Sequence, residues 1–259
     1  MGDRRRSAAW MSCLAALLAV PRLGAADAGD AVAAGDSAYA RADLAAALPL
    51  YQRALAAEPA FGTLCRITRV ESELGEDATG EEQRRLIASS VEHARAAVAM
   101  APDSALGHLW LAATLGRQAI REGPKTRLAL SREIKTEVDR SIEIDPGIGR
   151  AYHVRALWNR KVASLSTIER LAASAVLGGV PKGASMENAV SDLERAIELE
   201  PDYLNHHLEL ARTYLQLKRR DDARRELERV LALPPTSNPR DPVFQERARD
   251  LLARLPGGD

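Results

Sequence analysis

A proline recurs at the same point of five similar helical segments, and this repetition constrains the fold more than any other feature of the chain. The five proline-ended segments are residues 55–59, 98–102, 142–146, 197–201 and 231–235. Because proline has no amide proton and clashes with the preceding turn, it ends a helix and does not continue it. The repetition therefore indicates an array of helical hairpins and argues against a compact enzyme with a single core.

The last unit matches the tetratricopeptide pattern without a gap. Such repeats have about 34 residues in two antiparallel helices, with small residues where the helices cross and a proline near the end. In the last unit the small residues are Ala211 and Ala223, and Pro235 closes the repeat. The first unit fits the same register and places Gly35 against Ala47. The sequence thus predicts an all-α, tetratricopeptide-repeat right-handed superhelix.

The predicted domain, residues 27–259, contains five hairpins, an inserted helix in the fourth hairpin and a C-terminal capping helix. Successive closing prolines are 43, 44, 55 and 34 residues apart, so the three middle units are longer. We place their surplus between the two helices of each hairpin, in the polar stretches 76–82 and 121–125 and in the segment 164–184. The expected boundaries are about 28–61, 62–104, 105–148, 149–203 and 204–237 for the hairpins and 241–255 for the cap.

The longest insertion has the pattern of a helix of its own. Ser166 and Glu169 stand at capping-box spacing. Apolar residues follow at helical intervals, namely Ile168, Leu171, Ala172, Ala175 and Val176, before a glycine-rich stop at 178–181. This predicts an extra helix of about three turns.

Residues 1–26 read as a secretion signal, which predicts a secreted, periplasmic protein. Three consecutive arginines precede a 13-residue apolar stretch at 8–20, and small residues follow it. That stretch is too short to span a bilayer. Removal of the segment takes away four arginines and one aspartate and leaves 32 basic and 35 acidic residues, a net charge of −3. Nucleic acid is not an expected partner at that balance, and Cys65 is left without a disulfide partner and reads as a buried thiol.

A longer motif series resembles one family of repeat proteins. Trp158 to Ser166 is followed by Glu169-Arg170, by Gly179-Val180-Pro181 and by Glu187, and 108–112 reads His-Leu-Trp-Leu-Ala. This series, within residues 84–255, resembles the regulator of microtubule dynamics family and its bacterial secreted relatives. The resemblance implies the repeat fold and a binding role, and it names no partner, since microtubules are absent from a periplasm. Two positions depart from the pattern: Arg155 replaces a large apolar residue, so it needs a carboxylate or solvent, and Ala156 replaces a glycine.

No constellation typical of catalysis or metal binding occurs in the sequence. It has no His-Glu-x-x-His or Cys-x-x-Cys series, and the glycines at 75–80 lack the lysine and hydroxyl of a phosphate loop. The five histidines are interpreted as packed or solvated. We expect no catalytic residue, no metal and no cofactor.

The concave wall of the superhelix is the candidate binding surface. Wall positions of the first helices hold eight polar residues, which are our predicted partner-binding residues: Arg66, Arg117, Arg150, His153, Arg160, Lys161, Asn205 and Arg212. The only acidic residues at these wall positions are Asp36 and Glu73. Guanidinium groups suit carboxylates and phosphates. The alternative is that these arginines pair with acids of the second helices.

Two functions fit this wall. The leading hypothesis is a non-catalytic scaffold of the cell envelope that binds an acidic peptide or protein segment in a basic groove. The alternative is binding or transfer of a lipid or another amphiphile in the same groove.

Overall fold

The computed structural model describes residues 25–177, 179–236 and 238–255, and all regular secondary structure in these ranges is α-helical. Of the predicted signal, residues 1–24 lie outside the described chain. None of the described helices combines the length and apolarity of a membrane span. The helices are α1 (Ala25–Ala40), α2 (Leu44–Ala57), α3 (Phe61–Asp77), α4 (Gly80–Met100), α5 (Ala105–Ala119), α6 (Pro124–Ile144), α7 (Gly149–Ala163), α8 (Thr167–Leu177), α9 (Met186–Leu199), α10 (Leu204–Gln216), α11 (Arg220–Ala232) and α12 (Asp241–Arg254).

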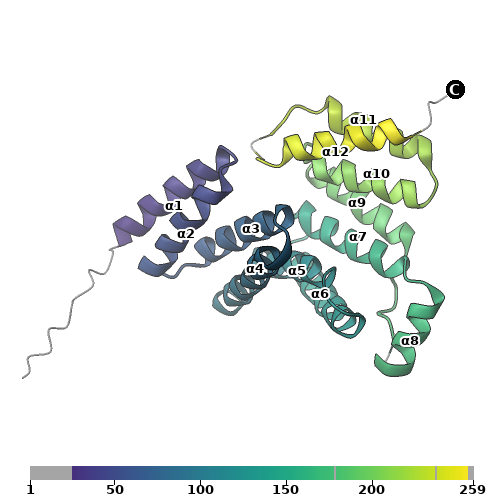
Figure 1. Cartoon of the computed structure of the whole chain (residues 1–259), viewed down its shortest axis with the longest axis horizontal. Helices are drawn as coiled ribbons and strands as arrows, with labels where there is room; N and C mark the ends of the chain where they lie inside the picture. The colour runs from purple at the N-terminus through teal and green to yellow at the C-terminus, as the bar shows by residue number, and fades with distance from the viewer. Residues whose placement is uncertain (1–24, 178, 237, 256–259) are drawn as a thin grey trace, which may run out of the picture.

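These helices pack as five hairpins that stack side by side into a curved superhelix (Figure 1). The hairpins are α1–α2, α3–α4, α5–α6, α7–α9 and α10–α11. Helix α8 is inserted between the two helices of the fourth hairpin, and α12 covers the last hairpin by packing on α10 and α11. The predicted tetratricopeptide-repeat superhelix, with its inserted helix and its cap, is confirmed.

The prolines end the second helix of every hairpin, as the pattern predicts. The C-terminal capping residue of each of these helices directly precedes a proline: Glu58, Ala101, Asp145, Glu200 and Leu233. In the last hairpin the proline after the cap is Pro234, one residue before the Pro235 of the repeat pattern.

The surplus of the second and third hairpins is not in loops, contrary to our placement. Only residues 78–79 separate α3 from α4, and 120–123 separate α5 from α6. The extra residues lengthen the second helices, because α4 and α6 have 21 residues each whereas α11 has 13. Gly80 opens α4 with a positive φ of 63°, and the Gln83 side chain donates to the Gly75 and Ala78 carbonyls across the turn.

The insertion in the fourth hairpin forms the predicted helix with its capping box. The Ser166 amide and hydroxyl donate to the Glu169 carboxylate, and the Glu169 amide donates back to the Ser166 hydroxyl. Ile168 and Leu171 of its apolar face are exposed to solvent. The side chains of the other three apolar positions lie outside the described residues.

Buried side chains of neighbouring hairpins share their apolar clusters, so no hairpin has a core of its own. The cluster around Leu208 and Leu227 takes residues from α7 to α12, and the cluster around Leu115 takes residues from α4 to α7. Ala156, where the family pattern has glycine, is fully buried. Cys65 is buried, and burial raises the pKa of its thiol to about 11, as expected for an inert packed cysteine.

Arg155, the charged residue at an apolar position, finds the carboxylate that the sequence analysis required. Its guanidinium donates two hydrogen bonds to Asp192 of α9, at 3.0 and 2.6 Å. The Asn159 amide donates to the same carboxylate. This bidentate pair joins the two helices of the fourth hairpin across the inserted segment.

Gly35 gives a direct test of the packing of the first hairpin. A β-carbon on Gly35 would lie 2.5 Å from the ring of Tyr51, so the close neighbour is this fully buried ring and not Ala47. Gly35→Ala is expected to destabilise the fold by about 1–3 kcal/mol, measured by urea unfolding. Gly29→Ala in the same helix is the matched control, because its β-carbon meets nothing within 4 Å, and it should be neutral or stabilising. Equal effects of the two substitutions would contradict this packing.

Candidate ligand-binding cavity

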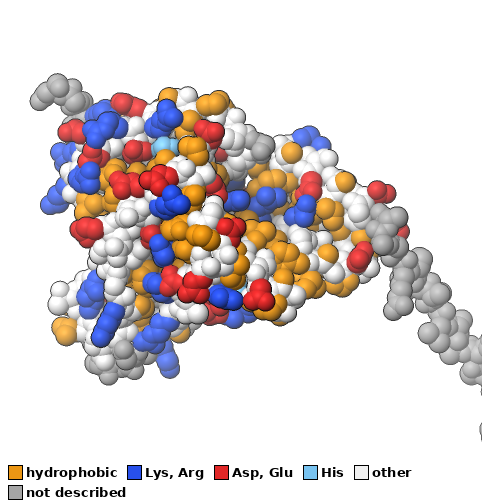
Figure 2. All heavy atoms as spheres, turned by 180° about the vertical axis from the view of Figure 1, so that it is seen from behind, with side chains coloured by type: hydrophobic (Ala, Val, Ile, Leu, Met, Phe, Trp, Pro, Cys, Tyr) orange, Lys and Arg blue, Asp and Glu red, His pale blue; other side chains and the backbone are white. Residues whose placement is uncertain are grey.

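The curved stack of hairpins forms a partly open cavity of about 1090 Å³. Residues of α3, α5, α6, α7, α8, α10 and α12 line it, so its walls come from four of the five hairpins and the cap. Figure 2 shows one face of the molecule hollowed near its middle, with apolar and basic side chains both present at the edge. Its volume lies slightly above the range of roughly 300–1,000 Å³ that small-molecule sites occupy.

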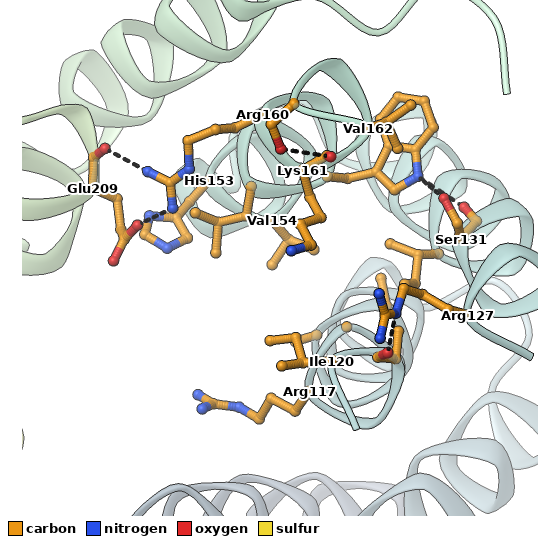
Figure 3. Close-up of a pocket in the computed structure, with 18 of the residues that line it drawn as sticks. Arg117, Ile120, Arg127, Ser131, His153, Val154, Arg160, Lys161, Val162 and Glu209 are labelled. Atoms are coloured by element: carbon orange, nitrogen blue, oxygen red, sulfur yellow. Dashed lines mark hydrogen bonds and ion pairs between the residues drawn. The ribbon is translucent and has the colours of Figure 1, made fainter. Parts of the chain in front are cut away.

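Apolar side chains make up much of the cavity wall. They project from α5, α6, α7 and α12 toward the same space, and they include Leu109, Trp110, Leu128, Val154, Leu157 and Phe244. The Trp158 indole, which also lines the cavity, donates to the backbone carbonyl of Ser131 at 2.8 Å (Figure 3). An apolar wall of this kind favours ligands with apolar surface.

Seven of the eight predicted site residues line this cavity, and one does not. The seven are Arg117, Arg150, His153, Arg160, Lys161, Asn205 and Arg212. The eighth, Arg66, donates to both oxygens of Asp36 at 2.8 and 3.0 Å and so joins α3 to α1 away from the cavity. The register of the repeats was therefore sufficient to find the concave wall.

The arginines of the wall are neutralised by carboxylates that the sequence analysis did not place there. Glu209 of α10 is buried, and it accepts hydrogen bonds from Arg160 of α7 and from Arg212 (Figure 3). Burial alone would raise the pKa of Glu209, but the charges of Arg160 and Arg212 outweigh it, and the pKa is lowered. Arg150 lies 3.5 Å from a carboxylate oxygen of Glu200.

A second carboxylate, Glu76 at the end of α3, lies between three arginines. Arg117 of α5 and Arg247 of α12 contact its two oxygens at 2.5 and 2.9 Å, and Arg240 lies 3.8 Å away. Arg240 also donates to both oxygens of Asp77. Burial would raise the pKa of Glu76, but the charges of Arg117 and Arg240 and the hydrogen bonds from Arg117 and Arg247 lower it to about 2. We call these five residues the α3–α12 ion-pair cluster.

The α3–α12 ion-pair cluster connects parts of the chain that are far apart in sequence. Residues 77 and 240 are separated by 163 positions, and the side chain of Arg240 is only 6% exposed. Helices α3 and α12 are not among the extensively packed helix pairs, so the side chains bridge the gap between them. The C-terminal cap is thereby fixed to the second hairpin, and four of the five cluster residues line the cavity.

Two buried histidines form a neutral pair at the cavity wall. The Nδ1 atoms of His153 and His206 lie 2.9 Å apart, so one ring donates its proton and the other accepts it. Tyr203 packs edge-on against His206. Burial, together with the neighbouring His206, lowers the pKa of His153 to about 3, and burial lowers the pKa of His206 as well.

This pair predicts a loss of stability in acid. In the unfolded chain both imidazoles accept protons near pH 6.5. In the fold the pKa of His153 is lowered to about 3, and the pKa of His206 is lowered as well. The unfolded state therefore binds more protons as the pH falls from about 6.5 toward about 3, and the free energy of unfolding decreases over that window. The urea midpoint should drop between about pH 7.5 and about pH 5, and His153→Gln, which cannot titrate, should reduce that drop.

His93 provides a control of opposite sign for this measurement. A hydrogen bond to Glu71 raises the pKa of His93, so its contribution to stability is present below about pH 6.5 and is lost as the pH rises. His93→Gln should therefore make the acid-induced drop larger. An unchanged drop in His153→Gln would contradict the assignment of the buried pair.

Lys161 differs from the arginines of the wall. Within the described chain its ammonium has no carboxylate within ion-pair distance, and the same holds for Lys125 at the start of α6. Both residues line the cavity and are exposed. Figure 3 shows Lys161 on one side of the cavity and Arg117 and Ile120 on the other. The described residues hold no group of three His, Cys, Asp or Glu side chains suited to a metal ion.

The fold and this cavity define the class of the protein, a tetratricopeptide-repeat superhelix with a large, partly open cavity on its concave side. A sequence model described as "Regulator of microtubule dynamics protein 1-3" matches residues 31–256. The chain belongs to this family, as the motif series of residues 84–255 indicated.

Curated relatives and a solved structure agree with this assignment. The chain is 28% identical over 191 residues to regulator of microtubule dynamics protein 1 of Caenorhabditis elegans, covering 74% of this chain and 84% of the relative. It is 29% identical over 190 residues to protein 3 of Rattus norvegicus, covering 73% of this chain but 40% of that longer relative. A thermophilic TPR protein of Thermus thermophilus shares the fold with a TM-score of 0.66 at 21% identity, covering 87% of this chain and 99% of the other.

Proposed function

We propose that this protein is a non-catalytic binding protein that holds an amphiphile, an apolar chain with an anionic end, in its central cavity. The observation that carries the proposal is the partly open cavity of about 1090 Å³ with a largely apolar wall. Lys125 and Lys161 line it without carboxylate partners among the described residues, so their charges are available to an anionic group.

The five arginines among the predicted site residues are already paired with carboxylates within the fold. Arg160 and Arg212 bind Glu209, Arg117 binds Glu76, and Arg66 binds Asp36. An acidic peptide would have to displace these carboxylates, and the displaced groups would then need new partners. The pairing therefore favours an amphiphile, our alternative reading of the sequence, over an acidic peptide in a basic groove.

A scaffold for a protein partner is the second candidate. It rests on the superhelical fold and on the relatives, which are named regulators of microtubule dynamics. A role in microtubule dynamics requires that the protein and microtubules occupy the same compartment. We propose instead that residues 1–26 direct export to the cell envelope, on the basis of their basic start and their apolar stretch.

Gly116 offers a substitution that fills the cavity without disturbing the fold. It lies inside α5 and lines the cavity, and a β-carbon at this position meets nothing within 4 Å. Gly116→Leu is expected to project into the cavity and to weaken binding of a dansyl-labelled fatty acid by roughly tenfold or more. Native mass spectrometry should show less co-purifying lipid than in the wild type.

Gly116→Ala is the matched control. It supplies the same gain in helix propensity, roughly 0.5–1 kcal/mol, but fills little of the cavity. Both variants should melt at or above the wild-type temperature, and only the leucine should impair binding. A wild-type protein that binds no fatty acid but binds a fluorescent poly-glutamate peptide would reject the amphiphile and support the peptide.

A further inference from the structure

Three large apolar side chains are exposed around the inserted helix. Ile120 is 66% exposed, Ile168 78% and Leu171 66%, and among the described residues the remaining large apolar side chain of this kind is Met100 at 47%. Ile168 and Leu171 are three residues apart and lie on the same face of α8. A helix normally buries such a face, so its exposure needs an explanation.

The contacts of α8 connect it to the helices next to Ile120. Arg170 of α8 donates to the carbonyls of Val162, Ala163 and Leu165, which fixes α8 to the end of α7. Helix α8 also packs on α6. Arg127 of α6 donates to the Ala119 carbonyl, directly before Ile120.

Charged residues of α6 and α7 also act on Glu169 of α8. The amide and hydroxyl of Ser166 lower the pKa of Glu169, and the charges of Lys161 and Arg127 contribute to this effect. Residues 120, 125, 161 and 168 all line the same cavity, and Arg121 and Leu171 are exposed on the same two segments. We call Ile120, Arg121, Lys125, Lys161, Ile168 and Leu171 the α8 rim.

Basic residues outnumber acidic ones along the α8 rim. Its exposed cations are Arg121, Lys125 and Lys161, whereas the acids near them are Glu122 and Glu169. Arg127 adds a fourth positive charge. The whole chain has 36 basic and 36 acidic residues, so this local excess is not a consequence of its composition.

Exposed apolar side chains between basic ones are suited to an anionic membrane surface. The apolar groups enter the boundary between head groups and acyl chains, and the cations attract anionic head groups. Three apolar side chains are few for a stable protein interface, which buries about 800 Å² on each partner. We propose that the α8 rim docks this protein on the surface of an anionic lipid bilayer, with the cavity opening toward the membrane.

This proposal deepens the proposed function, because an amphiphile could then pass from the bilayer to the cavity without crossing water. The docking itself does not require the cavity to bind anything. An experiment can therefore reject the membrane docking without rejecting amphiphile binding in the cavity, and the reverse.

Co-sedimentation with lipid vesicles tests the docking. The full-length mature protein is mixed with vesicles of phosphatidylglycerol and phosphatidylcholine, or of phosphatidylcholine alone. We expect sedimentation with the anionic vesicles, decreasing with added salt, and little with the neutral ones. The double variants Ile168→Asp/Leu171→Asp and Lys125→Glu/Lys161→Glu should each bind anionic vesicles roughly tenfold more weakly or worse.

Matched controls come from other exposed surfaces. Met100→Asp replaces an exposed apolar residue of α4, and Arg84→Glu reverses an exposed charge of the same helix. Both should bind vesicles like the wild type. The proposal is overturned if the wild type does not bind anionic vesicles, or if the rim variants bind as well as the controls. Rim-dependent self-association in analytical ultracentrifugation without vesicle binding would assign the α8 rim to a second copy and would also overturn it.

The fatty-acid experiment with Gly116→Leu separates the two proposals. Fatty-acid binding without vesicle binding leaves the cavity function standing and rejects the docking. Vesicle binding without fatty-acid binding leaves the docking standing and rejects the cavity function.

Discussion

Replacing Arg160 by alanine is expected to destabilise the protein by about 3–5 kcal/mol. The Arg160 side chain is 15% exposed and its partner Glu209 8%, so the ion pair between α7 and α10 is largely removed from water. Arg160 also donates to the Glu209 carbonyl and to the Thr213 hydroxyl, each at 3.0 Å. Without Arg160 the buried carboxylate of Glu209 keeps only Arg212, which is itself 34% exposed.

Urea unfolding of Arg160→Ala beside a charge-free double variant checks this prediction. Arg160→Met combined with Glu209→Met removes both charges and leaves apolar surface of similar volume, so it should cost less than Arg160→Ala alone. Arg212→Ala should cost less as well, because Arg160 still neutralises Glu209. A loss below about 1 kcal/mol for Arg160→Ala would mean that the pair is solvated and that the cavity wall is open there.

The expected instability of Arg160→Ala limits which substitutions can be used to test ligand binding. Replacing Arg150, Arg160 and Arg212 together by alanine would be the natural test of a basic groove. In this fold the triple variant would lose binding through unfolding, whatever its ligand. Substitutions at Gly116 and Lys161 report on the cavity without breaking a buried pair.

The second large effect is expected at the α3–α12 ion-pair cluster. Glu76→Ala/Asp77→Ala removes both carboxylates that hold Arg240 and Arg247, and it leaves Arg240 buried with its main partners gone. The expected loss is roughly 3 kcal/mol, because at least two charge-assisted hydrogen bonds, worth about 1.5–3 kcal/mol each, disappear. The cap should also separate from the second hairpin, since the side chains of the cluster bridge that gap.

Small-angle X-ray scattering together with thermal unfolding checks both parts of this expectation. The double variant should show a larger radius of gyration and a lower melting temperature than the wild type. Asp103→Ala is the control: it removes the exposed surface pair with Arg140 and should change neither quantity measurably. An unchanged radius of gyration in the double variant would mean that the cap is held to the second hairpin by other contacts.

Much of the fold could be predicted from the sequence, because the ends and the crossing of the two helices in each hairpin depend on residues close along the chain. Proline fixes the helix ends, and small residues at fixed spacing fix the crossing of the two helices. The middle hairpins show where this reading fails. Their surplus lengthens α4 and α6, and the polar residues 76–82 gave no reason to expect a helix, because composition does not distinguish an exposed turn from an exposed helix face.

The candidate site was predicted in part. Register alone placed seven of eight residues at the cavity, since the same repeat positions always face inward. It missed Glu76 and Glu209, which lie at positions not assigned to the wall, and with them the neutralisation of the arginines. It also missed the His153–His206 pair, because these residues are 53 positions apart and meet only when the hairpins stack.

The sequence by itself determined the helices, their pairing into hairpins and the family, because these depend on contacts between residues close along the chain. Only the tertiary structure decided which charges are free and which side chains meet around the cavity. Both depend on side chains from different hairpins, such as Arg160 and Glu209 or Asp77 and Arg240, whose meeting is set by how the hairpins stack.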